Sequence, residues 1–132
     1  MNSAQTEKKR TIDASGRSVG RIASEAALTL MGKDSPAFAR NKVGDTDVLI
    51  INARKIRVTG NKLVEKVYMR HTGYPGGQRS LTMKQLISKK GHKEALFKAI
   101  QGMLPANKLR PIMLKKVSIT EWAWNAYALM SA

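Results

Sequence analysis

Residues 48–51 read Val-Leu-Ile-Ile, an unbroken run of aliphatic side chains of which three are β-branched. Successive side chains of a strand point to opposite faces of a sheet, so a strand without polar positions must be covered on both faces. A parallel sheet that lies between helices provides such cover. The run therefore predicts a buried strand of an α/β protein.

Apolar residues at helical spacing precede this run. Positions 19, 22, 23, 26, 27 and 30 are all Val, Ile, Ala or Leu, and their spacing of three or four places them on one helix face. Ser18 can cap this helix and Gly32 can end it, so we predict a helix from Ser18 to about Met31. Comparable patterns predict three further helical segments: 82–90 with Thr82 as its cap, 92–103, and a short turn within 108–116.

Short β-prone segments complete the expected architecture. Additional strands are expected at 11–14, 56–59, 63–69 and 117–119. Strands that alternate with helices indicate one α/β domain with a central, mainly parallel sheet of about four strands, flanked by helices on both faces. The expected division is a flexible arm at 1–9, the α/β domain at 10–119 and an atypical aromatic C-terminal segment at 120–132.

The charge of the chain is strongly positive and unevenly distributed. The 24 Lys and Arg residues outnumber the 9 Asp and Glu residues, which gives a net charge of +15. Residues 61–120 alone contain 13 basic and 2 acidic side chains. Because such an excess destabilises a compact protein through self-repulsion, it indicates a polyanionic partner, and nucleic acid is the leading candidate.

Several other protein classes lack support in the sequence. There is no cysteine, which excludes disulfides and thiolate metal sites and fits a reducing compartment. The N-terminus lacks the apolar run of a secretory signal, no stretch approaches 18 apolar residues, and no basic amphipathic helix suggests membrane binding. A soluble intracellular protein without a membrane partner is therefore expected.

Residues 66–79, Lys-Val-Tyr-Met-Arg-His-Thr-Gly-Tyr-Pro-Gly-Gly-Gln-Arg, form the segment in which we first expect function. Tyr68 and its neighbours resemble the end of a strand, and the proline and glycines after His71 predict an open loop with accessible backbone amides. Tyr68, inside a strand, is expected to pack in the core, with stacking on a base as the alternative, whereas Tyr74 is expected to make an exposed contact. A basic, glycine-rich loop suits RNA, although a merely solvated turn is the alternative.

Catalytic and metal-binding motifs are missing. Neither a phosphate-binding P-loop nor a dinucleotide-binding glycine motif is present, and the acids are too scattered to form a catalytic pair. His71 and His92 have no cysteine and few carboxylates near them, so no metal or cofactor is expected. Gly16 and Gly20 stand at the start of a predicted helix, where backbone N–H groups can bind an anion. A nucleotide-using enzyme is therefore an alternative hypothesis. A free regulatory RNA-binding protein is a third hypothesis.

Five segments together resemble the universal large-subunit ribosomal protein thirteen family, of bacterial or organellar type. They are 13–24 (DASGRSVGRIAS), 48–56 (VLIINARKI), 58–62 (VTGNK), 70–78 (RHTGYPGGQ) and 102–105 (GMLP). Their order and spacing fit from about residue 10 to 119. The chain departs from the family where Leu109 is followed directly by Arg110, without the usual glycine, and where 122–132 replaces the family's histidine-containing tail.

The resemblance implies a non-enzymatic structural protein of the large ribosomal subunit that binds rRNA, contacts neighbouring ribosomal proteins and supports early subunit assembly and translation. It implies no small-molecule substrate, and a cytoplasmic, ribosome-bound location, with an organellar matrix also compatible. The loop residues that it places on rRNA are Arg70, His71, Thr72, Gly73, Tyr74, Gly76 and Gly77. The other candidate RNA-binding residues are Arg17, Arg21, Arg40, Lys42, Lys62, Lys66, Arg79, Lys84, Lys108, Arg110, Lys115 and Lys116.

Overall fold

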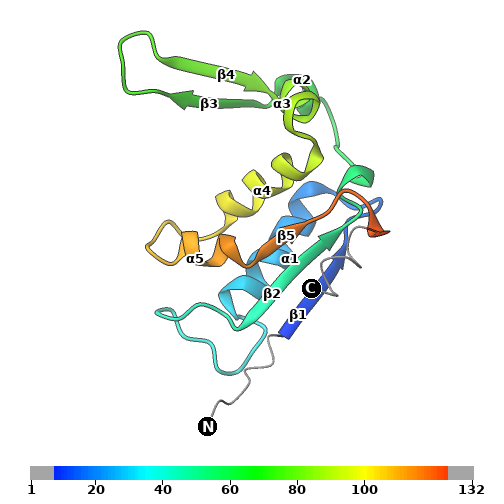
Figure 1. The fold of residues 1–132 in the computed structure, drawn as a ribbon, viewed down its shortest axis with the longest axis vertical. Coiled ribbons are helices and arrows are strands. Elements are labelled where there is room, and N and C mark those ends of the chain that lie inside the picture. Colours follow the sequence, from blue (N-terminus) through cyan, green and yellow to red (C-terminus); the bar gives the residue numbers. More distant parts are fainter. Residues whose placement is uncertain (1–7, 125–132) are drawn as a thin grey trace.

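The computed structural model describes residues 8–124, which form a parallel sheet, helices packed on it, and a projecting hairpin (Figure 1). The sheet contains β1 (Lys8–Asp13), β2 (Thr46–Ile51) and β5 (Val117–Ile119) in the order β1-β2-β5. Both strand pairs are parallel, which confirms the predicted α/β fold with a mainly parallel sheet. The sheet has three strands where about four were expected, because β3 and β4 pair separately.

The central strand β2 is buried as its sequence predicts. Val48, Leu49 and Ile50 expose only 1%, 6% and 0% of their surface, although Leu49 points to the opposite face from its two neighbours. Both faces of this strand are therefore shielded from water. The aliphatic run forms the middle of the sheet for this reason.

The helices α1 (Val19–Met31) and α4 (His92–Met103) pack against each other and contribute to one core with the sheet. Ile22 and Leu30 of α1 meet Leu96 and Ile100 of α4 in this core, and all four side chains are fully buried. Gly32 ends α1 with a left-handed backbone (φ 79°), as predicted. Both predicted helices are confirmed.

Three shorter helices and one 3-10 turn connect these elements. They are the 3-10 turn Ala53–Lys55, α2 (Lys62–Glu65), α3 (Met83–Lys90) and α5 (Arg110–Lys115). Thr82 caps α3 as predicted: its hydroxyl accepts from the Gln85 N–H at 3.3 Å, and the Gln85 side chain accepts from the Thr82 N–H at 3.0 Å. None of the helices within residues 8–124 has the length and apolar character needed to cross a membrane.

Three predicted strands differ from the structure, and one of them is the strand expected at 63–69, whose first residues belong to the helix α2. The expected strand at 56–59 is wrong, because only Arg57 bridges to Ser18 and the chain then turns at Gly60. The first strand begins at Lys8, three residues before the predicted start, because it continues in register along β2, with Lys8 opposite Thr46. Most of the predicted arm, and residues 125–132 of the aromatic segment, lie outside the described residues.

The hairpin consists of β3 (Val67–His71) and β4 (Gln78–Thr82), which pair antiparallel and extend away from the sheet (Figure 1). Only the end of the strand expected at 63–69 belongs to β3, because residues 62–65 form α2, and β4 was missed. Its sequence, Gln-Arg-Ser-Leu-Thr, has one apolar residue and none of the alternation that marks a half-buried strand. The hairpin thus carries the loop that the sequence singled out.

Candidate nucleic-acid interface

The hairpin is exposed along most of its length. Met69 and Tyr74 expose 70% and 76% of their surface, and Arg70, His71 and every loop residue except Gly77 are exposed. A hairpin that buries so little of itself gains little stability from packing. Its surface is available to a partner, and the expected exposure of Tyr74 is confirmed.

The loop between the two strands has a defined backbone. The Thr72 N–H donates to the Gly77 carbonyl at 3.1 Å, and the Gly77 N–H donates to the Tyr74 carbonyl at 3.0 Å. Gly73 and Gly76 have positive φ angles of 88° and 69°, where other residues are strained. A Cβ on Gly77 would collide with the Thr72 hydroxyl and lie 2.8 Å from the Tyr74 carbonyl. The glycines therefore fix the shape of this loop.

His71 has a structural partner inside the loop. Its Nδ1 accepts a hydrogen bond from the Gly73 N–H at 2.9 Å, so the ring is held beside the turn. Within residues 8–124, no group of three His, Cys, Asp or Glu residues is placed to hold a metal ion. The His71 side chain therefore helps to fix the conformation of the loop.

Arg70 and Arg79 face each other across the hairpin as a directly opposed pair. Like charges at opposed positions repel, and the described part of the chain provides neither arginine with a carboxylate partner. Phosphate oxygens between the two guanidinium groups would relieve this repulsion. Of the features of the hairpin, this arginine pair most strongly indicates a surface that binds an anion.

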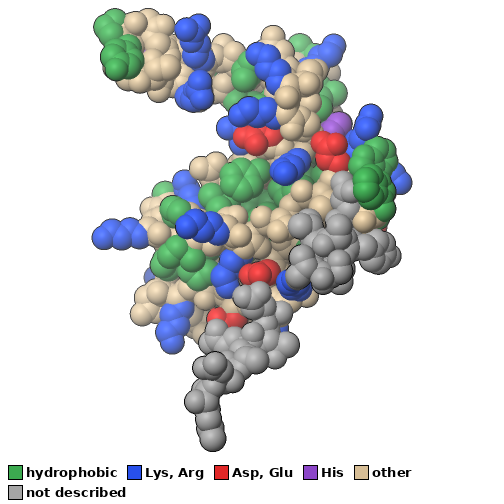
Figure 2. Space-filling view, viewed as in Figure 1, with side chains coloured by type: hydrophobic (Ala, Val, Ile, Leu, Met, Phe, Trp, Pro, Cys, Tyr) green, Lys and Arg blue, Asp and Glu red, His purple; other side chains and the backbone are tan. Residues whose placement is uncertain are grey.

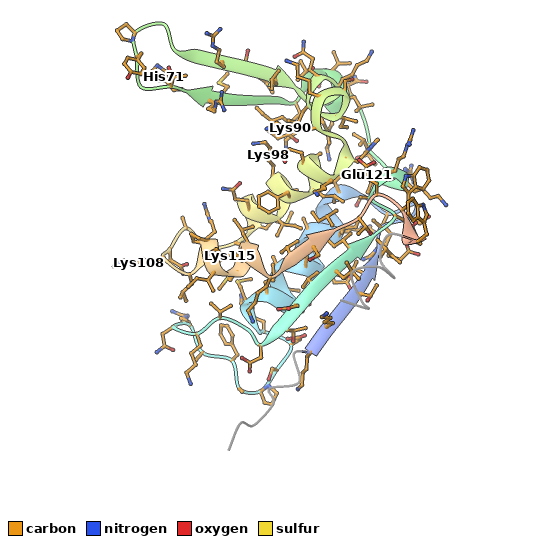
Figure 3. All side chains as sticks on the ribbon, in the orientation of Figure 1. His71, Lys90, Lys98, Lys108, Lys115 and Glu121 are labelled. Atoms are coloured by element: carbon orange, nitrogen blue, oxygen red, sulfur yellow. The ribbon has the colours of Figure 1, made fainter. Side chains whose placement is uncertain are left out.

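At the base of the hairpin, the half-buried Tyr68 lies outside the main hydrophobic core in which it was expected, and two lysines approach its ring. The Lys66 Nζ is 5.6 Å and the Lys98 Nζ 5.7 Å from the centre of the Tyr68 ring, within cation–π range. Burial raises the pKa of the Tyr68 hydroxyl above its usual value. Figure 3 shows Lys98 on α4, on the side of the body below the hairpin. Lys98 was not predicted, because a single lysine on a helix reads as a solvated charge.

The start of α1 adds arginines to the same region. A broad hollow there is lined by Arg17, Arg21, Arg57 and Lys62, which come from separate segments of the chain. Arg17 donates to Glu25 at 2.7 Å, and this bond, together with Arg10, lowers the pKa of the Glu25 carboxyl. Arg57 was not predicted, because it lay in a segment expected to form a strand.

Most of the remaining candidate residues lie around the loop at 33–45 and α5, whereas Lys84 lies on α3. Arg110 donates to the Leu104 carbonyl at 3.0 Å and to the Pro105 carbonyl at 3.2 Å, while Lys116 donates to the Gly44 carbonyl at 3.1 Å. These two side chains hold the body together. Those not used in this way are Arg40, Lys42, Lys84, Lys108 and Lys115, all exposed.

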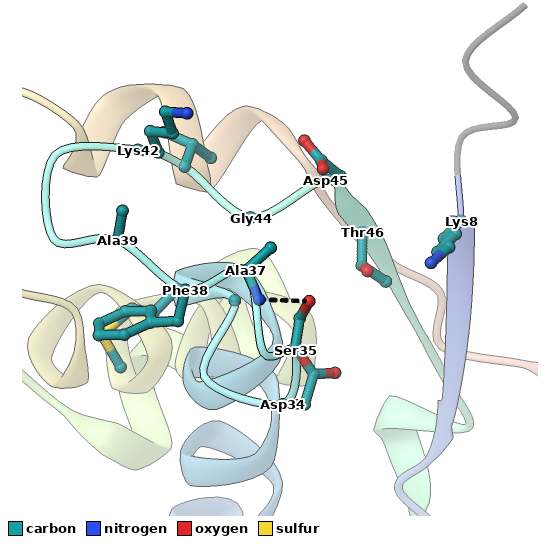
Figure 4. Close-up of a pocket in the computed structure, with 13 residues that line it drawn as sticks. Lys8, Asp34, Ser35, Ala37, Phe38, Ala39, Lys42, Gly44, Asp45 and Thr46 are labelled. Carbon is teal, nitrogen blue, oxygen red and sulfur yellow. Dashed lines mark hydrogen bonds between the residues drawn. The ribbon is translucent and has the colours of Figure 1, made fainter.

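The hollow beside the loop at 33–45 is lined by both basic and acidic residues. Lys8 and Lys42 line it together with Asp34 and Asp45 (Figure 4), and Asp34 also pairs with Arg10 at 3.5 Å. In contrast, the space-filling view shows many Lys and Arg side chains on and beside the hairpin (Figure 2). The region around the hairpin therefore suits a polyanion better than the hollow in Figure 4.

These features define a class: a small, strongly basic α/β protein whose glycine-shaped hairpin projects from a three-stranded parallel sheet. The sequence model of the family described as ribosomal protein L13 matches residues 7–121. The chain belongs to this family, as its motifs suggested.

Curated relatives agree over most of the chain. The large ribosomal subunit protein uL13 of Symbiobacterium thermophilum is 43% identical over 119 residues, which covers 89% of this chain and 82% of the relative. The uL13 protein of Moorella thermoacetica is 46% identical over 108 residues, covering 82% and 74%. That of Dehalococcoides mccartyi (strain BAV1) is 46% identical over 120 residues, covering 89% and 81%.

Proposed function

We propose that this chain is a structural constituent of the large ribosomal subunit, where it binds rRNA through the β3–β4 hairpin and supports early subunit assembly and translation. Its family and the name shared by its relatives, large ribosomal subunit protein uL13, support this role. The proposed partners are rRNA and neighbouring ribosomal proteins, and the proposed location is on ribosomes in the cytoplasm. No catalysis is part of the role.

The opposed pair Arg70 and Arg79 is the single observation that carries the rRNA proposal. Two cations at opposed positions of an exposed hairpin lower the stability of the free protein and favour an anion between them. The loop glycines let the backbone approach RNA closely, and Tyr74 offers a ring for stacking. The hairpin would therefore contribute both charge neutralisation and shape.

The body would contribute further phosphate contacts. Arg21, Lys62, Lys66 and Lys84 lie on elements at the base of the hairpin or beside it, and Arg17 adds a charge that Glu25 partly neutralises. Arg40, Lys42, Lys108 and Lys115 form a second, more distant group. Arg110 and Lys116 are engaged internally, so we assign them to the stability of the fold.

Sedimentation tests the ribosomal role directly. The tagged full chain, expressed in bacterial cells, should remain with the large subunit on a sucrose gradient after a high-salt wash. Free protein at the top of the gradient, even in low salt, would contradict the role and favour a regulatory RNA-binding protein. Saturable binding of a small phosphate ligand near Gly16 would instead favour the enzyme alternative.

Salt dependence tests the hairpin separately. Replacing Arg70 with Ala should weaken binding to large-subunit rRNA and reduce the slope of log K against log salt by about one. The matched control is Lys93→Ala, which removes one exposed charge from α4 outside the hairpin. Equal slopes for Arg70→Ala and the unmodified protein would show that Arg70 does not contact phosphate.

A further inference from the structure

A groove of about 390 Å³ lies where the hairpin meets the body. It is bounded by the start of α1, the 57–59 segment, the base of β3 and the outer side of α4, so segments distant in sequence form its walls. The space-filling view shows the molecule hollowed below the hairpin (Figure 2). The groove is separate from the hairpin loop.

Four cations surround this groove. Arg57, Lys62, Lys66 and Lys98 all line it, and none of the four forms an ion pair with another described residue. No Asp or Glu stands among the described residues that line it. Lys66 and Lys98 both lie within cation–π range of the Tyr68 ring. The rim is thus arranged for phosphate groups.

The wall of the groove is partly apolar. Val19, Val58, Ala99 and Met103 contribute aliphatic or thioether surface, and the half-buried Tyr68 contributes an aromatic ring. A site for phosphate alone would not need such a surface. A base and its sugar would cover it, and a volume of this size falls in the range of small-ligand pockets. A base in a duplex is stacked and paired, so it cannot enter.

We propose that this groove receives one unpaired nucleotide of an RNA strand. Its phosphates lie against Lys66, Lys98 and Arg57, and its base lies against Tyr68 and the apolar wall. The inference rests on the proposed RNA-binding function and gives it a second, structurally distinct contact. The hairpin would then bind RNA through its backbone and shape, whereas the groove selects a strand with an extruded or single-stranded base.

The test compares single-stranded with duplex RNA on the full chain. A fluorescent 12-nucleotide RNA and a blunt duplex of the same sequence are titrated against Lys98→Ala and Arg57→Ala. Each variant should weaken single-strand binding about fivefold, because one desolvated phosphate contact is lost, and change duplex binding less than twofold. Lys93→Ala, which removes the same charge from the same helix as Lys98, should leave both affinities within twofold.

The aromatic wall has its own pair of variants. Tyr68→Phe keeps the ring and should bind like the unmodified protein, whereas Tyr68→Leu should lose about threefold or more for the single strand. Thermal unfolding of each variant shows whether the fold is kept. Should Tyr68→Leu unfold, the lysine and arginine variants decide the matter on their own.

Two results would overturn the proposal. One is that Lys98→Ala and Arg57→Ala behave like Lys93→Ala, or weaken duplex and single strand equally. The other is that free nucleoside monophosphates bind as tightly as the RNA strand, which would make the groove a mononucleotide site. In either case, cosedimentation with the large subunit and the effect of Arg70→Ala would remain as tests of the proposed function.

Discussion

Arg70 and Arg79 stand directly opposite each other in the β3–β4 hairpin. Both side chains are exposed, and neither forms an ion pair within residues 8–124. Opposed like charges destabilise a strand pair by a few tenths of a kcal/mol to about 1 kcal/mol. The hairpin is therefore less stable alone than with an anion between the two arginines.

Replacing Arg79 with Glu should convert this repulsion into a cross-strand ion pair with Arg70. The amides of β3 should then exchange their hydrogens more slowly in the free protein, because the hairpin opens less often. RNA binding should become weaker than in Arg79→Ala, since the new carboxylate repels phosphate. Hydrogen exchange and salt titrations measure the two effects.

Lys93→Glu is the matched control for this prediction, because it changes the net charge equally on α4. It should lower RNA affinity less and leave hydrogen exchange in β3 unchanged. If Arg79→Glu bound RNA as tightly as Lys93→Glu does, the hairpin pair would have no special part in binding.

Gly44 and Gly102 predict opposite responses to alanine. A Cβ on Gly44 would lie 2.8 Å from the Leu30 carbonyl and 2.9 Å from the Gly32 nitrogen, so the loop and the end of α1 would have to separate. We expect Gly44→Ala to lower the free energy of unfolding by about 2 kcal/mol. Gly102 in α4 has open space around it, and Gly102→Ala should raise that free energy by about 0.5 kcal/mol.

Chemical denaturation of the two variants checks this pair. Because both variants replace glycine with alanine, a difference between them reports the contacts around each position and not the general effect of alanine on the backbone. A loss of stability at Gly102, or none at Gly44, would contradict the packing described around these glycines.

The elements that the sequence predicted correctly are those whose own residues determine their environment. The run at 48–51 has no polar position, so only a strand covered on both faces suits it, and Gly32 and Thr82 mark helix ends through local backbone chemistry. The loop at 72–77 was recognised for the same reason. Its glycines and proline exclude regular structure whatever surrounds them.

The features that were missed depend on partners distant in the chain. The strand β4 has no hydrophobic alternation and exists because it pairs with β3. Arg57 and Lys98 come 41 residues apart, and only the folded chain brings them to one groove. Nor could the sequence show that Arg110 and Lys116 donate to backbone carbonyls within the folded body.

The cap of α3 predicts a stability effect that depends on a hydroxyl group. Thr82→Ala removes the acceptor for the Gln85 N–H, so the free energy of unfolding should fall by about 1 kcal/mol. Thr82→Ser keeps the hydroxyl and should recover most of the loss. Denaturation of both variants measures this difference, and equal losses would indicate that packing of the threonine methyl, not capping, stabilises this site.

The pairing of Glu25 with Arg17 predicts how stability depends on pH. The hydrogen bond from Arg17, assisted by Arg10, holds the pKa of Glu25 below its ordinary value of 4.5. A carboxyl whose pKa is lower in the folded state stabilises the fold above the unfolded pKa, and this contribution is lost as the pH falls through the folded pKa. Stability should therefore decline between about pH 5 and pH 3.

Glu25→Gln should lower the free energy of unfolding at pH 7 and flatten its decline over this acidic range, because the titrating group is gone. Arg17→Gln should flatten the decline in part, since Arg10 still lies 3.0 Å from the same carboxylate. The loss of stability in the double variant should be smaller than the sum of the losses in Glu25→Gln and Arg17→Gln, because the two residues act on one interaction. Denaturation at a series of pH values measures all three variants, and fully additive effects would show that the ion pair does not contribute to folding.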